Sequence, residues 1–267
     1  MKRVALILAG GAGTRLRPLS SDENPKQFLR IFNGQSLLQK TYARVRDVAD
    51  AIYISTNDAY EEKCREQVPK AVVLTEPARR NTAPAIALCC FEIEQREGQC
   101  VIAVLPSDHF IGDETEFASV IEQAFSFAES NDDLVIIGIE PTEPNTGYGY
   151  LQLGEEIAPG VIRLERFTEK PSREKAEEFL RAGNYAWNAG IFVWRAALFR
   201  RELEHAAPDI AKVSRENYDS MPSISIDYAL MEKAPRVAAI RGDFGWSDVG
   251  SFEALERVGV NVGALLK

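Results

Sequence analysis

The 267-residue sequence predicts an α/β fold with a mainly parallel sheet, and three observations support that prediction. Short apolar runs rich in Val and Ile alternate with longer amphipathic segments, which is the pattern of βαβ units. The first apolar run leads directly into a glycine-rich segment, where a parallel strand would deliver the backbone to a ligand. With 45% hydrophobic and 27% charged residues, the composition is that of an ordinary globular protein.

The apolar runs predict the strands of the first half and the amphipathic runs predict its helices. The expected strands cover residues 4–8, 51–55, 71–74, 101–105 and 134–139. The expected helices cover residues 37–45, 82–95 and 117–125. Right-handed crossovers place the carboxyl ends of parallel strands along one edge of the sheet. Each loop that follows such a strand is therefore a candidate site.

The second half has a different pattern. A loop-like segment, residues 140–150, leads to strand-like runs in a region that we expect to be more antiparallel. These runs cover residues 150–153, 161–167 and 189–194. Without an internal repeat, low-complexity segment or linker, we predict a single domain over residues 1–267. Its first lobe is residues 1–140, its second lobe residues 141–257, and residues 258–267 form a boundary that is possibly truncated.

Charge and composition exclude several classes of protein. The formal net charge of −9 argues against nucleic acid and anionic membranes as partners. No apolar run approaches the roughly 20 residues that cross a bilayer, and the N-terminus lacks the features of a signal peptide. The four cysteines have no metal-ligand spacing, so we expect buried free thiols. We expect a soluble, cytoplasmic protein.

The segment over residues 8–20 combines glycines with positive charge. Three glycines in four positions let backbone N–H groups surround an anion without a Cβ in the way. These glycines are Gly10, Gly11 and Gly13. Arg15, Arg17 and Lys26 add full positive charges nearby, which suits a polyphosphate better than a single carboxylate. We therefore predict a polyphosphate-binding loop rather than a simple glycine-rich turn.

The segment over residues 75–85 follows the third predicted strand and opens a helix. Asn81 or Thr82 can cap the free N–H groups of that helix, and Pro84 is tolerated in its first turn. Such a helix start at the ligand edge can also bind a nucleobase or ribose through directional hydrogen bonds. The residues alone leave both interpretations open.

Two aspartates are candidates for a metal site. Asp108 follows the fourth predicted strand in a Pro-Ser-Asp-His sequence, and Asp248 lies in a Trp-Ser-Asp-Val-Gly sequence. A carboxylate beside phosphates needs a cation between them, and Mg²⁺ commonly binds one or two carboxylates together with phosphate oxygens. Each aspartate taken alone is also typical of a turn or a helix cap. The two histidines, His109 and His205, fit no triad or zinc pattern.

Compact polar clusters lie next to the strands of the second half. Glu169 and Asn188 can exchange hydrogen bonds with vicinal sugar hydroxyls, and Lys170 can face a sugar phosphate. Gly147 and Gly190 lie in or beside these clusters. The alternative is that Glu169 and Lys170 form a solvated pair at a strand end and that Asn188 is a turn residue.

With these residues in view, the chain resembles the sugar-1-phosphate nucleotidylyltransferases. The resemblance covers residues 8 to about 252 and rests on motifs in the order of that family. The motifs are Leu-Ala-Gly-Gly-Ala-Gly-Thr-Arg-Leu-Arg-Pro-Leu-Ser, Pro-Lys-Gln-Phe, Arg-Asn-Thr-Ala-Pro-Ala, Pro-Ser-Asp-His, Gly-Tyr-Gly-Tyr, Phe-Thr-Glu-Lys-Pro, Trp-Asn-Ala-Gly and Trp-Ser-Asp-Val-Gly-Ser-Phe. The third and the last look like those of the mannose-1-phosphate guanylyltransferase branch.

The resemblance implies a Rossmann-like three-layer α/β/α sandwich with a mixed, mainly parallel sheet, the nucleotidyltransferase fold. It implies transfer of a nucleotidyl group from GTP to mannose 1-phosphate with Mg²⁺, giving GDP-mannose and pyrophosphate. The first lobe would bind the nucleotide and the second the sugar phosphate. Catalysis is expected from Arg15 and Lys26, and metal binding from Asp108 and Asp248. The expected substrate-binding residues are Leu8, Ala9, Gly10, Gly11, Gly13, Thr14, Asn81, Thr82, Ser107, Gly147, Glu169, Lys170, Asn188 and Gly190.

Members of the family usually continue into a β-helical segment or an isomerase-type domain, whereas this sequence ends soon after Phe252. A homodimer is therefore one possible assembly of this chain, and isomerase activity is not expected. Two alternatives remain open: a related enzyme with another base or sugar specificity, and a nucleotide-sugar sensor without turnover. A dinucleotide-binding dehydrogenase fits poorly, because no acidic residue ends a strand about 20 residues after the glycines.

Overall fold

The computed structural model describes residues 1–11 and 13–265, without the side chain of residue 14. Within this part of the chain, a nine-stranded sheet has the order β3-β2-β1-β4-β8-β5-β9-β7-β6. The strands are β1 (Lys2–Leu8), β2 (Ala51–Asn57), β3 (Val72–Glu76), β4 (Cys100–Pro106), β5 (Leu134–Ile139), β6 (Tyr150–Ala158), β7 (Val161–Thr168), β8 (Tyr185–Arg195) and β9 (Val237–Gly242). The α-helices are α1 (Leu37–Val45), α2 (Glu61–Gln67), α3 (Thr82–Glu97), α4 (Glu114–Ser130), α5 (Arg173–Ala182), α6 (Ala196–Ala206), α7 (Phe252–Arg257) and α8 (Val262–Leu265).

The pairing of the strands confirms the predicted fold class. β1 pairs in parallel with β2 and β4, and β2 pairs in parallel with β3. β5 and β9 form a further parallel pair. β8 runs antiparallel to both β4 and β5, and the pairings of β6 and β7 are antiparallel as well. The result is a mixed sheet in which β3, β2, β1 and β4 form a continuous parallel run.

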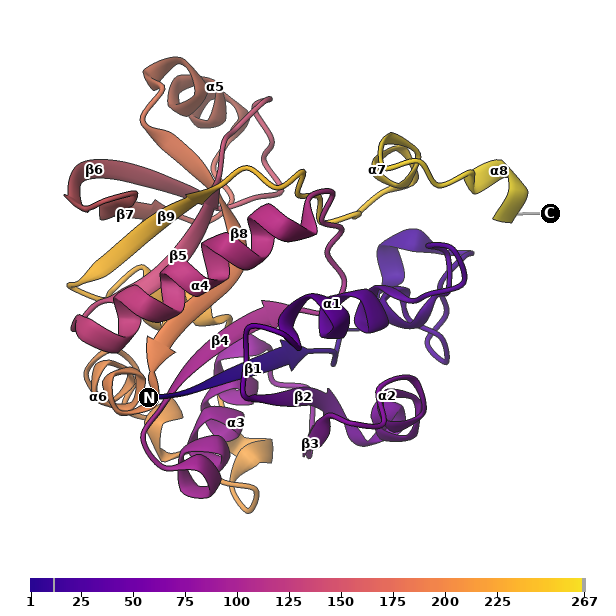
Figure 1. Cartoon of the computed structure of the whole chain (residues 1–267), viewed down its shortest axis with the longest axis horizontal. Coiled ribbons are helices and arrows are strands. Elements are labelled where there is room, and N and C mark those ends of the chain that lie inside the picture. Colours follow the sequence, from indigo (N-terminus) through magenta and orange to yellow (C-terminus); the bar gives the residue numbers. More distant parts are fainter. Residues whose placement is uncertain (12, 266–267) are drawn as a thin grey trace.

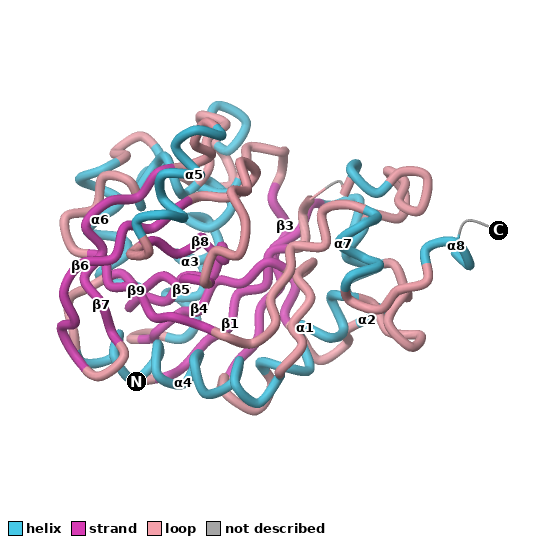
Figure 2. Tube along the Cα trace, turned by 90° about the horizontal axis from the view of Figure 1, so that it is seen from above, coloured by secondary structure: helices cyan, strands magenta, loops and turns pink. Residues whose placement is uncertain are grey.

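Helices cover both faces of the sheet, so the fold has three layers (Figures 1 and 2). Apolar side chains of α1, α2 and α4 pack on one face, and those of α3 and α6 pack on the other. In α4 the buried stripe includes Phe117, Val120 and Ile121, with the spacing of a helix that buries one side. α7 and α8 pack separately, against Leu16 and Leu37.

Several elements differ from the sequence-based expectation; β6, for example, extends to Ala158 rather than ending at residue 153. β8 begins at Tyr185 rather than at residue 189, so Asn188 lies within a strand and the interpretation of Asn188 as a turn residue was wrong. The sequence did not predict β9, whose centre is the pair Ala238 and Ala239. Alanine has little intrinsic strand preference, so only burial between β5 and β7 makes this run a strand.

The topology brings several loops to one edge of the sheet. β4, β5 and β9 run in the same direction as β1, while β8 runs the opposite way. The register pairs Val104 with Phe192 and Gly138 with Asn188, so the first half of β8 lies at the carboxyl end of its neighbours. The loops after β1, β4, β5 and β9 therefore meet residues 188–190, and these segments form the candidate site.

The structure also bears on the cysteines and on membrane insertion. All four cysteines are buried free thiols, as the sequence predicted. Burial raises the pKa of Cys64 to about 11, so this thiol is held in its unreactive protonated form. Among the described residues, no helix combines the length and apolar character needed to cross a bilayer.

Candidate active site

The glycine-rich loop after β1 is held from outside by side chains. The Gln27 amide donates to the carbonyl oxygens of Ala9 and Gly11, at 2.9 and 2.8 Å. The Thr56 hydroxyl donates to the Ala9 carbonyl at 3.2 Å. With these bonds the backbone of the loop is already fixed before any ligand arrives, which lowers the cost of ordering it on binding. Thr14 begins a short 3-10 helix, Thr14–Leu16, but its predicted role rests on a side chain that lies outside the described part.

Two glycines of the loop are required by close approach. Gly13 has φ of +60°, and a Cβ there would lie 2.5 Å from the Lys26 backbone nitrogen. The Ser20 hydroxyl donates to the Gly13 carbonyl at 2.6 Å and holds this conformation. A Cβ on Gly10 would lie 2.7 Å from Oε1 of Glu76. Glycine is thus needed for packing within the protein as well as for access by a ligand.

Lys26 lies between the two predicted metal ligands. Its side chain is only 5% exposed, and its ammonium group is 2.9 Å from Oδ2 of Asp108 and 2.6 Å from the Asp248 carbonyl. Burial acts to raise the pKa of Asp108, but the Lys26 ammonium, together with His109 and Arg15, outweighs it and the net shift is downward. Asp108 is therefore a carboxylate, and it faces the same point as the Asp248 backbone.

The Asp248 carboxylate is oriented by three groups. Its Oδ1 accepts hydrogen bonds from the Tyr148 hydroxyl at 2.8 Å and from the Gly250 N–H at 3.2 Å. Its Oδ2 lies 3.6 Å from a guanidinium nitrogen of Arg15. Arg15 itself is mostly exposed, so this ion pair is weak and its guanidinium remains accessible to a ligand. Arg17, by contrast, pairs with Asp22 at the surface.

The donor set suits Mg²⁺ better than a metal that needs an all-protein cage. Asp108 contacts the Lys26 ammonium group through its carboxylate, whereas Asp248 contacts it through its backbone carbonyl, so both residues lie beside Lys26. Among the described residues, no group of three or more His, Cys, Asp or Glu side chains could hold a metal ion. Asp108 and Asp248 could each offer one carboxylate to Mg²⁺, and phosphate oxygens and water would then complete the shell, which is the usual arrangement for this ion.

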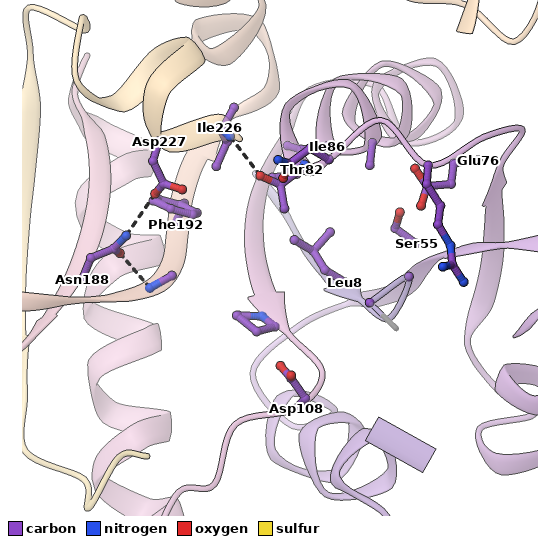
Figure 3. Close-up of a pocket in the computed structure, with 17 residues that line it drawn as sticks. Leu8, Ser55, Glu76, Thr82, Ile86, Asp108, Asn188, Phe192, Ile226 and Asp227 are labelled. Carbon is purple, nitrogen blue, oxygen red and sulfur yellow. Dashed lines mark hydrogen bonds between the residues drawn. The ribbon is translucent and has the colours of Figure 1, made fainter. Parts of the chain in front are cut away.

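A cavity of about 430 Å³ runs along the sheet edge between the two halves of the chain (Figure 3). Figure 3 shows Glu76 and Ser55 on one side, Asn188 and Asp227 on the opposite side, and Asp108 below. The cavity is lined by Leu8, Gly10, Gly11, Ser55, Glu76, Arg79, Asn81, Thr82, Ala85, Ile86, Pro106, Asp108, Asn188, Gly190, Phe192, Ile226 and Asp227. Eight predicted site residues from both lobes are among them: the metal-binding candidate Asp108 and seven substrate-binding candidates, Leu8, Gly10, Gly11, Asn81, Thr82, Asn188 and Gly190.

The start of α3 caps its own helix and also reaches the second half of the chain. Asn81 has φ of +65°, and its side chain accepts a hydrogen bond from the Thr82 N–H at 2.8 Å, which confirms the predicted cap. The Thr82 hydroxyl accepts a hydrogen bond from the Ile226 N–H at 2.9 Å. Both residues line the cavity, so the helix start forms part of its wall as well.

Glu76 was not singled out from the sequence. It ends β3 at the ligand edge, and Oε2 accepts a hydrogen bond from the buried Tyr218 hydroxyl at 2.6 Å. Burial raises the pKa of Glu76 above its usual value. Arg79, whose guanidinium donates to the Tyr60 hydroxyl at 3.0 Å, lines the same end of the cavity. The rule that pointed to Asp108, a polar residue at the carboxyl end of a parallel strand, would also have found Glu76.

The opposite end of the cavity carries an amide and a carboxylate. The Asn188 side chain donates to Oδ1 of Asp227 at 3.0 Å and accepts from the Gly190 N–H at 2.7 Å. These bonds assign the orientation of the amide and leave Asp227 facing the cavity (Figure 3). Asp227 starts a five-residue π-helix, Asp227–Met231, and no sequence pattern pointed to it. Local π-helical turns often occur at functional sites.

Glu169 joins this end of the site, and Gly149 makes room for it. A Cβ on Gly149 would collide with the Glu169 carboxylate, and the Gly149 carbonyl accepts the Asn188 N–H at 2.8 Å. Lys170 pairs with Glu169 at 3.6 Å but is mostly exposed. Gly147 does not take part in this group and lines a second cavity instead, so Gly149 is the glycine next to Glu169.

The second cavity, of about 880 Å³, has Asp248, Arg15 and Gly147 in its wall together with four aromatic side chains. These aromatic residues are Phe110, Tyr148, Trp187 and Trp246. The Trp246 N–H donates to Nδ1 of His109 at 3.1 Å. Burial lowers the pKa of His109 to about 4, so the ring is neutral at physiological pH and can accept this bond.

Ser107 connects two strands and a helix through its backbone. It is buried, its N–H donates to the Leu8 carbonyl at 3.0 Å, and its carbonyl accepts the Thr41 hydroxyl at 3.4 Å. The residue fastens the loop after β4 to β1 and so helps to place Asp108.

The state of Glu169 predicts a dependence of stability on pH. Burial and the Asp227 charge raise the pKa of Glu169 from 4.5 to about 7, against the opposing effect of Lys170, while Glu232 adds to the rise. Between these two pH values the folded state binds more protons than the unfolded state, so the free energy of unfolding falls as pH rises. In Glu169→Gln this fall between pH 5 and pH 8 should be smaller, as measured by urea unfolding. An equal fall in both proteins would contradict the shifted pKa.

The fold and the site together define a class: an α/β protein that presents a glycine-rich, lysine-containing loop and two carboxylates at one sheet edge. Residues 4–263 match a protein family whose description is Nucleotidyl transferase. The chain belongs to this nucleotidyl transferase family.

Individual relatives agree with this assignment. The chain is 39% identical to a mannose-1-phosphate guanylyltransferase of Sinorhizobium fredii, with 95% of this chain and 54% of that protein covered. A Thermus thermophilus structure described as mannose-1-phosphate geranyltransferase matches with 37% identity and a TM-score of 0.90, over 97% of this chain and 79% of that one. A Helicobacter pylori structure described as mannose-6-phosphate isomerase matches with 28% identity and a TM-score of 0.80, over 92% and 100%. The chain spans about 54% to 60% of the length of the curated relatives it matches.

Proposed function

We propose that this protein transfers a guanylyl group from GTP to α-D-mannose 1-phosphate and releases pyrophosphate. The observation that carries this proposal is the single cavity that extends from Glu76 to Asn188, with Asp108 and the glycine loop between them. A nucleotide bound at one end of the cavity and a sugar phosphate bound at the other would bring their phosphates together beside Lys26. The names of two relatives, each called mannose-1-phosphate guanylyltransferase, support this choice of substrates.

The chemistry is an in-line attack by a phosphate oxygen of the sugar phosphate on the α-phosphorus of the nucleotide. The attacking oxygen is already anionic, so the protein needs no nucleophile of its own and acts by positioning and by charge neutralisation. Lys26 and Arg15 would neutralise charge on the phosphates as pyrophosphate leaves. Asp108 and Asp248 would hold Mg²⁺, which when bound supplies further positive charge to the departing group.

The residues at the two ends of the cavity would select the substrates. At one end, the Glu76 carboxylate can accept the N–H groups on the Watson–Crick edge of guanine, and Arg79 can donate to a purine acceptor. At the other end, Asn188, Asp227 and Glu169 can hold the hydroxyl groups of the sugar. The Asn188 amide, with its orientation set by Asp227 and Gly190, would keep one N–H and one oxygen lone pair for the sugar hydroxyl groups.

A pyrophosphate-release assay tests the function. Purified protein with Mg²⁺ is given mannose 1-phosphate or glucose 1-phosphate and each of the four nucleoside triphosphates in turn. We expect the fastest release with GTP and mannose 1-phosphate. Release with another pair would reassign the specificity, and nucleotide binding without release from any pair would support a sensor and refute the enzyme.

Replacement of Glu76 tests the assignment of the base. In Glu76→Gln the side chain keeps an acceptor for the Tyr218 hydroxyl but replaces one oxygen with a donor, which opposes the guanine N–H groups. We expect kcat/KM for GTP to fall about tenfold or more, because donors would be left unpaired in the complex. The ratio of kcat/KM for GTP to that for ATP should fall with it. An unchanged ratio would place guanine recognition elsewhere.

A further inference from the structure

We infer that Tyr148 is a positioning residue whose hydroxyl group holds the Asp248 carboxylate in the orientation that serves the cation site. The inference rests on the cation-binding role that the proposed function gives to Asp248. Tyr148 itself lies in the loop before β6, far along the chain from the loop after β9 that carries Asp248. The contact between Tyr148 and Asp248 therefore joins two segments that only the fold brings together.

The two carboxylate oxygens of Asp248 have different partners. The Tyr148 hydroxyl and the Gly250 N–H both donate to Oδ1. Oδ2 is left on the side of Arg15, 3.6 Å from its guanidinium, while the Asp248 carbonyl binds Lys26. If the Tyr148 hydroxyl is removed, the Gly250 N–H, at 3.2 Å, is the one donor to Oδ1 that remains among the described residues. The carboxylate can then rotate. A carboxylate that binds a metal loses affinity when its orienting partner is removed.

The ring of Tyr148 is held firmly enough to serve as an anchor. It makes edge-to-face contacts with Trp187 and Trp246, each with ring centroids 5.1 Å apart. Trp246 is in turn held by its hydrogen bond to His109, the residue after Asp108. Aromatic contacts of this kind stabilise a ring's position beyond the effect of burial alone. The hydroxyl is therefore placed by packing, and the packing connects the loops of both predicted metal ligands.

Tyr150 provides a matched control two residues away. Its side chain is fully buried, and among the described residues no hydrogen-bond partner lies near its hydroxyl. Tyr150→Phe therefore makes the same chemical change as Tyr148→Phe without the loss of a hydrogen bond. The two variants differ only in whether the deleted oxygen contacts Asp248.

The test measures cation binding apart from turnover. Mn²⁺ is titrated into the wild-type protein, Tyr148→Phe and Tyr150→Phe, each with GTP and without sugar phosphate, and protein-bound Mn²⁺ is followed by water-proton relaxation. We expect the Mn²⁺ dissociation constant of Tyr148→Phe to rise about tenfold. Tyr150→Phe should match the wild type. A value for Tyr148→Phe within twofold of the wild type would overturn the inference, as would an equal rise in Tyr150→Phe.

A parallel titration with Mn²⁺ alone separates this inference from the proposed function. If the wild-type protein releases no pyrophosphate and Tyr148→Phe still weakens Mn²⁺ binding, the proposed function fails and the positioning role stands. If pyrophosphate is released and Mn²⁺ binding is unchanged in Tyr148→Phe, the positioning role fails alone.

Turnover provides a second readout for active protein. The kcat of Tyr148→Phe should fall by more than its KM for mannose 1-phosphate rises, because the hydroxyl acts on Asp248. A rise in this KM alone, with kcat and Mn²⁺ affinity unchanged, would instead make Tyr148 a sugar contact and overturn the inference.

A second variant decides the matter if Tyr148→Phe is not recovered folded. Trp187→Phe keeps the Tyr148 hydroxyl but removes part of the surface against which the ring packs. We expect the Mn²⁺ dissociation constant to rise about threefold, less than for loss of the hydrogen bond itself. Unchanged Mn²⁺ affinity in folded Trp187→Phe would then contradict the inference.

Discussion

Asp108→Asn should lower kcat by about 10²- to 10³-fold, the size of effect seen when a group that stabilises transition-state charge is removed. The substitution keeps the size of the side chain and an oxygen that can accept the Lys26 hydrogen bond. It removes the negative charge that would hold Mg²⁺ beside the phosphates. The measurement is pyrophosphate release at saturating GTP and mannose 1-phosphate over a range of Mg²⁺ concentrations.

The matched control for Asp108→Asn is Asp133→Asn. Asp133 is a buried carboxylate that pairs with Arg163 and Arg236 and lies just before β5, at the edge of the sheet opposite the site. Its replacement should lower the free energy of unfolding at least as much as Asp108→Asn does, because it breaks two ion pairs. Its kcat should be that of the wild type. If Asp108→Asn also retains near-normal turnover with Mg²⁺, Asp108 has no role in the reaction.

Gly13→Ala should reduce both stability and turnover. A left-handed conformation costs an L-residue about 1–2 kcal/mol. The new Cβ would also meet the Lys26 backbone nitrogen at 2.5 Å, an atom that cannot rotate away. Lys26 must then shift, and a displacement of about 1 Å in a catalytic group can cost about a hundredfold in rate. Urea unfolding and pyrophosphate release measure the two effects.

Gly34→Ala separates the strain at Gly13 from the collision. Gly34 also has a positive φ, +79°, but among the described residues nothing lies within 4 Å of a Cβ built there. This variant should lose only the conformational term, about 1 kcal/mol, and keep its activity. Gly13→Ala with the same small loss and normal turnover would show that Lys26 does not depend on this close approach.

Sequence reasoning predicted the strands well where burial on both faces makes the run of apolar residues continuous. The runs in β1, β4 and β5 are apolar throughout, and their positions were predicted within two residues at each end. β9 was missed because two alanines at its centre carry no preference, and β8 was predicted too short because Asn188 and Gly190 interrupt its apolar run. The extension of β8 matters, since it contains Asn188.

The candidate site was predicted in part. Strand ends located Asp108, and the glycine pattern located the loop, because both signals are local in sequence. Asp227 has no local signal, since a π-helical turn between two loops leaves no pattern to read. Gly147 was chosen over Gly149 for the same reason. Either glycine fits the motif, and only the contact with Glu169 separates them.

By itself the sequence determined the α/β class, the glycine-rich loop with its charges, and the carboxyl-edge position of Asp108, because periodicity and strand ends are properties of neighbouring residues. The tertiary structure alone decided that Lys26 lies between Asp108 and Asp248, that Tyr148 orients Asp248, and that Glu76 and Asp227 face each other across one cavity. These contacts join residues from different loops. Their geometry depends on strand order and register, which no local pattern of residues encodes.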